Sequence, residues 1–339
     1  MTTSLVLVGL GRMAVGNQQL AGELPLSHAD AALAAGGFEI SGLVDLDAAR
    51  RVAAAARFPG VPLVEGLEAL PANTGEVIVI CASTCAHADL ATRALARSPA
   101  VVVVEKPMAA DLDSAIVLFH AVEDAGAVLR VNFHRRFDPR HRHWRDRLPQ
   151  APRLIEMRYG KGLLNYGSHM VDWLLDWYGE IESVRALPLR VDDSAADPSP
   201  SFVCFMAGGF EVVVLGVAGL DYDQFEIDIL ATGERLTLAD GGAEIRRQTP
   251  RMAKHYAGYA HLVPEVGADD TAPVGGFLEL YRAIAAYCLT GAPLPGCDHR
   301  AGLLNMAVLE AVRLSQSRAG VAIRPRELLQ RSFDNVAIR

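Results

Sequence analysis

The sequence predicts an α/β protein in two parts, a doubly wound parallel sheet followed by an α+β domain built on an antiparallel sheet. Short β-branched runs alternate with alanine-rich helical stretches up to residue 133, and strand-like segments then follow one another directly. Apolar strands separated by helices are typical of a parallel sheet covered on both faces. Consecutive strands joined by glycine-rich turns are typical of an antiparallel sheet. We therefore expect one domain over residues 1–133 and a second over 134–339.

The first domain is expected to begin with a strand, a glycine turn and a helical region. Its predicted strands are residues 5–8, 40–44, 77–81, 101–104 and 128–132. The helices expected after the second, third and fourth strands are residues 48–57, 87–97 and 112–125.

The second domain is expected to begin with helices over 137–147 and 169–178. Its predicted strands are residues 183–189, 202–206, 211–217, 225–230 and 234–238, with a surface loop over 191–200. Two helices, over 277–289 and 299–317, are expected to close the chain.

The composition excludes several classes of protein. The 339 residues are 51% hydrophobic and carry a formal charge of −8, so the chain can bury cores and has no general attraction for nucleic acid or anionic membranes. We expect no membrane-spanning segment, because apolar runs are only as long as strands. Five cysteines without a C-x-x-C pair, and an N-terminus without a basic leader, predict a cytoplasmic protein without disulfides.

A glycine-bearing turn follows the first predicted strand. Residues 9–14 read Gly-Leu-Gly-Arg-Met-Ala. The first glycine allows a tight turn, the second lets a pyrophosphate approach the backbone, and the small third residue allows close packing of helix and strand. Such a motif is weak alone, since glycines also end strands, but here it lies where a dinucleotide site requires it.

Asp45 ends the second predicted strand, where a carboxylate accepts hydrogen bonds from a ribose diol. It lies 34 positions beyond Gly11, whereas a spacing of about 20 is usual, so we expect an insertion within residues 17–38. A carboxylate repels a 2′-phosphate, which favours NAD(H) over NADP(H), although Arg12 in the glycine turn could offset the repulsion. The alternative role for Asp45 is a helix N-cap, which Asp47 would fill equally well.

Two further segments carry chemistry. Glu105-Lys106-Pro107 follows a strand at the sheet edge where ligands bind in such folds, and the alternative is a solvated ion pair. Asn165, His169 and Asp172 are spaced to share one face of a helix, where a histidine can accept a hydroxyl proton. A histidine at a helix start is more commonly a cap or a buried structural residue.

Together these residues resemble the Gfo/Idh/MocA oxidoreductase family. The resemblance rests on residues 9–14, Asp45, His87 with Ala94-Leu95, the Glu-Lys-Pro segment, Asn132 with Arg135-Arg136-Phe137, Gly167-x-His169-x-x-Asp172, and the helix over 307–315 with Gly320. It implies a Rossmann domain over 1–133, and over 134–339 a substrate-binding and oligomerisation domain with a large, mainly antiparallel open-faced sheet. A homodimer or homotetramer through that sheet is implied as well.

The resemblance also implies roles for individual residues. Lys106 orients the reacting hydroxyl and the nicotinamide, His169 accepts the proton, and Asn165 completes the catalytic set. The expected cofactor-binding residues are Gly9, Gly11, Arg12, Met13, Asp45, Ala82, Ser83, His87, Glu105 and Lys106. The expected substrate-binding residues are Arg136, Lys161, Asn165 and Asp172.

This chain departs from the family pattern at two places. Asn165 stands where many members have Asp, so an amide that cannot ionise replaces a carboxylate. Ala82-Ser83 stands where Thr-Pro is usual, which leaves the nicotinamide ribose to Ser83, Thr84 or the backbone. His87 keeps its place, although its role could be only to cap its helix.

One segment, residues 134–147, is strongly basic. A solvated helix face is the expected role from Arg140 onward, an anion site is the alternative near Arg136, and a nucleic-acid patch is the least favoured because the chain is acidic and aromatic residues are few. The histidines lack thiol or carboxylate partners at metal-ligand spacing, so we expect no metal site.

The sequence thus predicts an NAD(P)-dependent oxidoreductase acting on a secondary alcohol or ketone of a polyol, sugar, cyclitol or sugar nucleotide. NAD(H) is favoured, with NADP(H) as the alternative. Two other functions stay open: an NAD-dependent glycoside hydrolase that works by transient oxidation and elimination, and a dinucleotide-binding regulator without turnover. The retained Lys106 and His169 argue against the regulator, because a sensor needs no proton acceptor.

Overall fold

The computed structural model describes residues 2–16, 24–72, 74–149, 151–188, 196–265, 270–271 and 275–336. The chain forms two compact units, each made of two segments. The first comprises Met1–Arg142 with Gly275–Met306, and the second comprises His143–Val274 with Ala307–Arg339. The sequence predicts a single boundary after residue 133. That division does not include the contribution of Gly275–Met306 to the first unit. Residues 17–23 of the expected insertion, residue 189 at the end of the strand expected over 183–189, and residues 191–195 of the expected surface loop lie outside the described residues.

The first unit is built on a sheet that has seven strands among the described residues, in the order β16-β6-β5-β4-β1-β2-β3. The strands are β1 (Thr3–Val8), β2 (Phe38–Val44), β3 (Leu63–Val64), β4 (Val77–Ile80), β5 (Val101–Val104), β6 (Leu129–Val131) and β16 (Cys297–Asp298). Strands β1 to β6 are parallel, and β16 pairs antiparallel with β6. This order confirms the predicted doubly wound parallel sheet and places its topological switch point between β1 and β4.

Some helices of the first unit begin after a residue whose side chain caps them. Asp47 accepts from the N–H of Ala49 at the start of α3, and Asp111 accepts from Ser114 at the start of α5. The helices are α1 (Arg12–Val15), α2 (His28–Ala35), α3 (Ala48–Arg57), α4 (His87–Leu95), α5 (Leu112–Ala125), α8 (Gly276–Thr290) and the first part of α9 (His299–Ser317), with short helical turns at Leu67–Ala69, Thr84–Ala86 and His134–Phe137. Helix α6 (Pro139–Arg145) bridges the division between the units.

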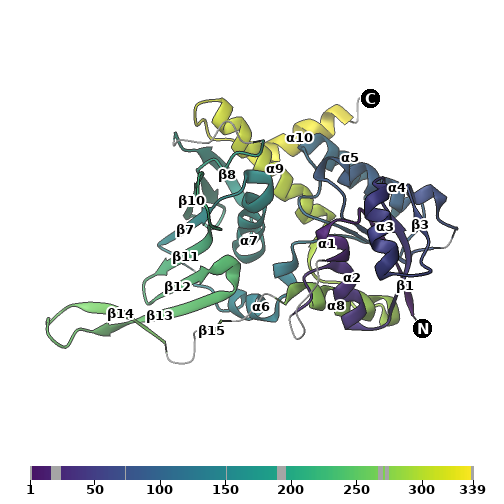
Figure 1. Cartoon of the computed structure of the whole chain (residues 1–339). Coiled ribbons are helices and arrows are strands. Elements are labelled where there is room, and N and C mark those ends of the chain that lie inside the picture. The colour runs from purple at the N-terminus through teal and green to yellow at the C-terminus, as the bar shows by residue number, and fades with distance from the viewer. Residues whose placement is uncertain are drawn as a thin grey trace. The chain divides into compact units, whose positions relative to one another are not determined.

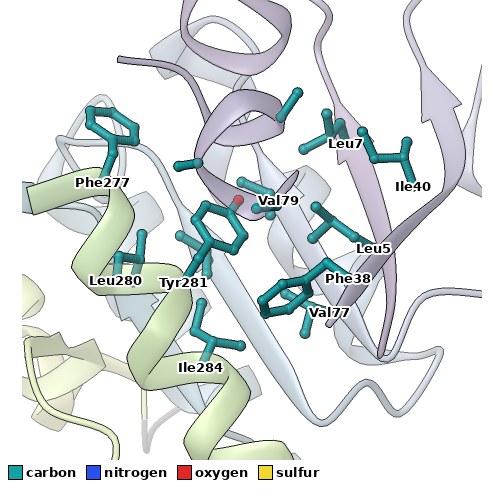
Figure 2. Close-up of a cluster of buried hydrophobic side chains, with 14 of the residues drawn as sticks. Leu5, Leu7, Phe38, Ile40, Val77, Val79, Phe277, Leu280, Tyr281 and Ile284 are labelled. Atoms are coloured by element: carbon teal, nitrogen blue, oxygen red, sulfur yellow. The ribbon is translucent and has the colours of Figure 1, made fainter. Parts of the chain in front are cut away.

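The core of the first unit includes a helix from late in the sequence. Apolar side chains of β1, β2 and β4 pack against Phe277, Leu280, Tyr281 and Ile284 of α8 (Figure 2). Leu280, Tyr281 and Ile284 are fully buried. Since burial of apolar surface is the main stabilising contribution, the segment Gly275–Met306 is an integral part of this unit.

The second unit is built on a sheet with nine strands among the described residues, in the order β14-β13-β12-β11-β7-β10-β9-β8, with β15 paired to β13. The strands are β7 (Leu154–Tyr159), β8 (Ile181–Ala186), β9 (Phe202–Met206), β10 (Glu211–Gly216), β11 (Phe225–Ala231), β12 (Glu234–Ala239), β13 (Glu244–Met252), β14 (Ala260–Pro264) and β15 (Asp270–Thr271). Strands β7 and β10 pair in parallel and the other neighbours are antiparallel. The predicted mainly antiparallel sheet is confirmed.

Strands β13 and β14 form a hairpin that extends beyond β12 (Figure 1). Strand β12 pairs with β13 only up to Gln248, after which β13 pairs with β14 alone. Neither strand was predicted, because charged residues interrupt β13 and most side chains of the hairpin are exposed or half-buried.

Helices of the second unit include one that the sequence did not predict. The π-helical turn Leu163–Gly167 runs into α7 (Ser168–Tyr178), and α9 ends at Ser317. A third closing helix, α10 (Pro325–Val336), follows, so the expectation that two helices close the chain is wrong. Its signal was Pro325 at the first helical position, where the missing N–H costs nothing.

Candidate functional site

A cavity of about 660 Å³ lies at the carboxyl edge of the first unit's sheet. It is bordered by the ends of β1, β2 and β4, which is where ligands bind in doubly wound sheets. Among the predicted cofactor residues it is lined by Gly9, Asp45, Ala82 and Ser83. The other lining residues are Val8, Val44, Leu46, Arg50, Glu65, Gly66, Ala86, Asp89, Leu90 and Arg93.

In the glycine turn after β1, the first glycine leaves no room for a side chain. Gly9 has a φ of +85°, and a Cβ built there would meet the backbone nitrogen of Ala82 at 2.5 Å. Gly11 is different, since no protein atom lies within 4 Å of a Cβ at that position. The backbone at Gly11 is therefore open to a ligand. Arg12 and Met13 follow in the single-turn helix α1, and both are exposed.

Asp45 is held with its carboxylate toward the glycine turn. Its Oδ2 accepts the N–H of Leu10 at 2.7 Å, and its Oδ1 accepts the N–H of Asp47 at 2.8 Å. The guanidinium of Arg50 lies 3.6 Å from Oδ2. Asp47, and not Asp45, caps α3, so the alternative role of Asp45 as a helix cap is filled by its neighbour.

These residues fit a dinucleotide. Gly11 leaves the backbone accessible, Asp45 presents a fixed carboxylate with lone pairs that a ribose diol can use, and the cavity is lined by apolar walls as well as polar groups. Ser83, which follows β4, is exposed at the same edge.

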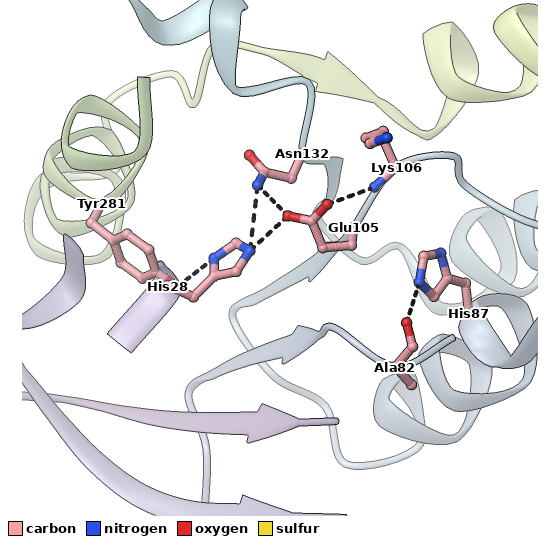
Figure 3. Close-up of polar contacts among 7 residues, drawn as sticks. All are labelled: His28, Ala82, His87, Glu105, Lys106, Asn132 and Tyr281. Atoms are coloured by element: carbon pink, nitrogen blue, oxygen red, sulfur yellow. Dashed lines mark hydrogen bonds and ion pairs between the residues drawn. The ribbon is translucent and has the colours of Figure 1, made fainter. Parts of the chain in front are cut away.

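Glu105 anchors the loop that carries Lys106 (Figure 3). Its Oε2 accepts the backbone N–H of Lys106 at 3.2 Å, and its Oε1 accepts the amide of Asn132 at 2.6 Å and contacts Nε2 of His28 at 3.0 Å. Burial raises the pKa of Glu105, but hydrogen bonds from His28 and Asn132 and the nearby positive charges outweigh it, and the pKa falls to about 2. The carboxylate is therefore ionised, and the Lys106–Pro107 peptide bond that follows is cis.

His87 connects two loops of the sheet edge through its ring. Nδ1 lies 2.8 Å from the carbonyl oxygen of Pro107, and Nε2 lies 3.0 Å from that of Ala82. The side chain is buried at the start of α4. His87 thus ties the loop after β4 to the Glu-Lys-Pro loop after β5, and its role extends beyond capping a helix.

Arg136 lies in the helical turn His134–Phe137, directly after β6, and is half-buried. The residues after it do not form a purely solvated face as expected, because Arg140 pairs at 3.4 Å with the buried Asp138 and His141 is buried.

In the second unit, the segment from Asn165 to Asp172 lies where the π-helical turn runs into the α-helix α7. Asn165 lies in the π-helical turn and is exposed, whereas His169 and Asp172 lie in α7 and are buried. The expected α-helical spacing therefore holds for His169 and Asp172 but not for Asn165. The His169 ring lies 5.9 Å from that of Phe225, nearly perpendicular to it.

Asp197 holds the π-helical turn in place. Its two carboxylate oxygens accept the backbone N–H groups of Leu164 and Asn165, each at 3.0 Å. These are amides at the start of a helix, which lack partners within the helix itself. π-Helical turns are rare and recur at functional sites, so Asp197 supports the segment that carries Asn165 and leads to His169.

Lys161 pairs with Asp223 and lies over the ring of Tyr166 at 5.6 Å. The hydrogen bond with Asp223 raises the pKa of Lys161. A pocket of about 180 Å³ adjoins it, lined also by Asp197, Ser199 and Tyr222. Lys161 therefore already has an anionic partner in the protein.

The structure thus groups the predicted residues by unit. Those of the glycine turn, Asp45, the loops after β4 and β5, and Arg136 belong to the first unit, and Lys161, Asn165, His169 and Asp172 belong to the second. The meeting of Lys106 with His169 stays a prediction.

Sequence reasoning missed three residues of the site. His28 and Tyr281 meet through a hydrogen bond across 253 positions, which no local pattern can reveal. Asp197 contacts its partners across 32 and 33 positions. The only local signal was Ser27, which caps the helix that His28 begins.

Within the described parts of the chain, no group of three or more His, Cys, Asp or Glu residues is arranged to hold a metal ion. No helix in those parts is both long and apolar enough to cross a membrane.

The strand order, the glycine turn and the carboxylate after β2 define a Rossmann domain of the dinucleotide-binding class. Residues 3–133 match the family model GFO_IDH_MocA, described as "Oxidoreductase family, NAD-binding Rossmann fold". These residues are therefore similar to the NAD-binding Rossmann domain of the Gfo/Idh/MocA family, and the match covers the N-terminal part of the chain.

Individual proteins are similar to this chain in part of the sequence or in fold. Inositol 2-dehydrogenase from Arthrobacter sp. (strain FB24) is 39% identical over 106 residues, which cover 30% of this chain and 31% of that relative's length. An oxidoreductase from Agrobacterium radiobacter in complex with NAD+, L-tartaric acid and magnesium superposes with a TM-score of 0.75 at 17% identity, covering 97% of this chain and 100% of the other. The WlbA dehydrogenase from Bordetella pertussis, in complex with NADH and UDP-GlcNAcA, superposes with a TM-score of 0.73 at 19% identity, covering 96% and 99%. At such identities, the two solved structures show that the fold is shared over nearly the whole chain.

Proposed function

We propose that this protein is an NAD(P)-dependent oxidoreductase acting on a secondary alcohol or ketone of a sugar, cyclitol or sugar nucleotide. The observation that carries the proposal is the buried Glu105 anchor, which fixes the backbone of Lys106 at the end of β5. This strand pairs with β4, whose carboxyl end borders the cavity of Gly9 and Asp45. A lysine whose backbone is anchored at this edge of the sheet suits chemistry in which negative charge develops on oxygen.

Lys106 and His169 divide the work at the reacting hydroxyl in this proposal. NAD, when bound, supplies the hydride chemistry at its nicotinamide ring. The Lys106 ammonium stabilises the developing alkoxide, and the imidazole of His169 accepts the hydroxyl proton in the oxidative direction and returns it in the reductive one. Asn165 orients the substrate by hydrogen bonding, and Asp172, on the helix turn after His169, supports the substrate side of the site.

NAD(H) is the favoured cofactor because Asp45 presents a negative charge where a 2′-phosphate would lie. Both carboxylate oxygens already accept backbone hydrogen bonds, so the carboxylate cannot easily turn away. Arg50 beside Asp45, and Arg12 in the glycine turn, are the cations from which affinity for NADP(H) would come.

The substrate class rests on the polar groups available and on relatives. Inositol 2-dehydrogenase is named for a cyclitol, and the WlbA dehydrogenase structure contains a sugar nucleotide. Arg136 is the cation that we assign to an anionic substrate group. Lys161 would have to exchange Asp223 for such a group, which favours neutral hydroxyls at its position.

We further propose that the protein forms a homodimer or homotetramer through the second unit's sheet. One face of that sheet is half-exposed and mixes apolar Val213 and Leu215 with the charged pairs Arg158–Glu226 and Arg235–Asp228. The hairpin of β13 and β14 adds exposed apolar and aromatic side chains at Met252, Tyr256, Tyr259 and Leu262. Such a surface is typical of protein–protein contacts.

The deciding experiment measures turnover and cofactor affinity in Lys106→Ala. NAD+ is assayed with a panel of polyols, cyclitols, sugars and sugar nucleotides, and NADH affinity is measured by fluorescence. We expect Lys106→Ala to abolish turnover and to leave the NADH dissociation constant within a few-fold of wild type. Arg318→Ala, which removes a cation at an exposed position outside the site and the proposed interface, is the control. Turnover at the wild-type rate in Lys106→Ala would refute the proposal.

A further inference from the structure

Four side chains from distant segments form a buried hydrogen-bonded chain beneath Lys106 (Figure 3). The hydroxyl of Tyr281 lies 2.9 Å from Nδ1 of His28, and Nε2 of His28 lies 3.0 Å from Oε1 of Glu105. The chain ends at Glu105 Oε2, which accepts the N–H of Lys106. His28 and Tyr281 are fully buried, and Asn132, which also donates to Glu105, is nearly so.

The ionised carboxylate fixes the direction of the hydrogen bond between His28 and Glu105. A carboxylate only accepts, so Nε2 of His28 must donate to Glu105. A neutral imidazole accepts from the Tyr281 hydroxyl at Nδ1, and an imidazolium donates to it. In either form the contact with Tyr281 fixes the ring orientation in which His28 holds Glu105.

His28 couples helix α8 to the loop after β5, which carries Glu105 and Lys106. Its ring lies 5.1 Å from that of Phe277 and 5.9 Å from that of Tyr281, so apolar packing fixes its plane as the hydrogen bonds fix its ends. Neither His28 nor Tyr281 lines the cavity at the glycine turn. A loss of either side chain should therefore disturb Lys106 more than the dinucleotide site.

We propose that His28 and Tyr281 are positioning residues, which hold the Glu105 carboxylate and through it the backbone from which Lys106 reaches the substrate. The inference rests on the proposed function for the meaning of Lys106, but the physical coupling can be tested without turnover.

The chain offers a direct probe, because it has only three lysines, Lys106, Lys161 and Lys254. Lysine labelled with 13C at Cε gives one NMR signal for each, and the Lys106 signal is identified by its loss in Lys106→Arg. Lys161 and Lys254 belong to the second unit, so their signals report whether that unit is disturbed, and NADH affinity reports whether the first unit keeps its fold.

The variants separate positioning from packing. His28→Leu keeps bulk but removes both nitrogens, and His28→Gln keeps an amide donor toward Glu105. Tyr281→Phe removes one hydroxyl, and Tyr287→Phe makes the same change on the same helix outside the cluster. We expect the Lys106 signal to move in His28→Leu and, by less, in Tyr281→Phe, and to stay in place in His28→Gln and Tyr287→Phe.

The dependence of kcat on pH gives a second readout. It would not change if His28 served only to fill space. Burial raises the pKa of Glu105, and hydrogen bonds to its carboxylate lower it. Without the hydrogen bond from His28, the pKa should rise from about 2, and the carboxyl should begin to take up a proton in mild acid. The titratable groups that face it are His28 from α2, Cys81 after β4, His134 after β6, Tyr281 from α8 and its neighbour Lys106. Burial raises the pKa of Cys81 and Tyr281 and lowers that of His134 to about 3, so these three stay neutral through mild acid.

We expect kcat of His28→Leu to fall by about tenfold or more, with an acid limb that wild type and His28→Gln lack, while NADH affinity changes little. The substrate is the compound that wild type turns over fastest in the panel. An unmoved Lys106 signal in folded His28→Leu would overturn the proposal, and if that variant fails to fold, an unmoved signal in Tyr281→Phe would do so. Failure of the proposed function looks different, since Lys106→Ala would then keep turnover whatever His28 does.

Discussion

The backbone N–H of Leu10 donates a 2.7 Å hydrogen bond to the carboxylate of Asp45, 35 positions further along the chain. This bond joins the glycine turn after β1 to the end of β2, so the two parts of a nucleotide site are held together by the protein itself. The carboxylate also accepts from Asp47, which fixes its second oxygen.

Asp45→Ser should change the preference between the two dinucleotides. The variant loses the negative charge that accepts from a ribose diol and repels a 2′-phosphate, and Arg50 stays in the cavity. We expect NADH to bind at least about tenfold more weakly, as expected for the loss of hydrogen bonds to a charged group, and NADPH to bind more tightly. Fluorescence titration of both cofactors checks this. Asp47→Asn, which keeps a cap for α3, should leave the preference unchanged, and an unaltered ratio in Asp45→Ser would contradict the assignment.

Glu105→Gln should flatten the dependence of stability on pH in acid. The folded pKa of about 2 lies below the ordinary value of 4.5, so the ionised carboxylate contributes stability that is complete above about pH 4.5 and is lost as the pH falls toward 2. The contribution is of the order of 3 kcal/mol. Urea unfolding between about pH 5 and pH 3 should show a steeper decline for wild type than for Glu105→Gln. Parallel declines would show that Glu105 titrates alike in both states.

Asp197→Ala should loosen the π-helical turn without unfolding the second unit. Two amide donors, those of Leu164 and Asn165, lose their carboxylate acceptor, which should cost about 2 kcal/mol in the free energy of unfolding. Asp197→Asn keeps one acceptor oxygen and should cost about half as much. We expect kcat to fall in the same order, while NADH affinity, which belongs to the first unit, holds. Thermal unfolding and steady-state rates measure the two effects, and equal costs for Ala and Asn would count against the double hydrogen bond.

Gly9→Ala should damage the dinucleotide site through a collision with the loop after β4. The new Cβ would lie 2.5 Å from the backbone of Ala82, at a φ of +85° that L-residues rarely adopt. We expect a loss of at least about 2 kcal/mol in stability and a loss of NADH binding. Gly36→Ala, also at positive φ but with open space around it, separates backbone strain from collision. Similar losses in both variants would show that strain alone accounts for the effect.

Local patterns predicted the elements whose signals lie within a few residues. The bounds of α3, α5 and α9 match the predicted helices because capping residues and apolar spacing mark them. Strand β7 was missed although it alternates buried Ile155 and Met157 with charged Glu156, because those charges interrupt an apolar run. Beyond the buried Ile245, the side chains of β13 and β14 are exposed or half-buried, so no alternation of buried and exposed residues reveals the hairpin.

The residues of the candidate site also differ in whether a local pattern reveals them. Gly9, Asp45 and Glu105 could be predicted because each acts where its own strand ends. His28, Tyr281 and Asp197 could not, because their partners lie far away in the sequence and only the folded topology brings them together. The π-helical turn at Asn165 also departs from an α-helical spacing for a reason that is not local, since Asp197 comes from a different segment.

The return of Gly275–Met306 to the first unit has a consequence for biosynthesis. When the ribosome has made only the first 142 residues, β6 lacks its neighbour β16, and the apolar side chains that will meet α8 are still open to water. All of the intervening segment His143–Val274 must emerge before that surface can close, so the nascent Rossmann domain spends much of translation incomplete and exposed to chaperones and aggregation. A gene truncated after the apparent end of the dinucleotide motifs would encode an open core instead of a portable module.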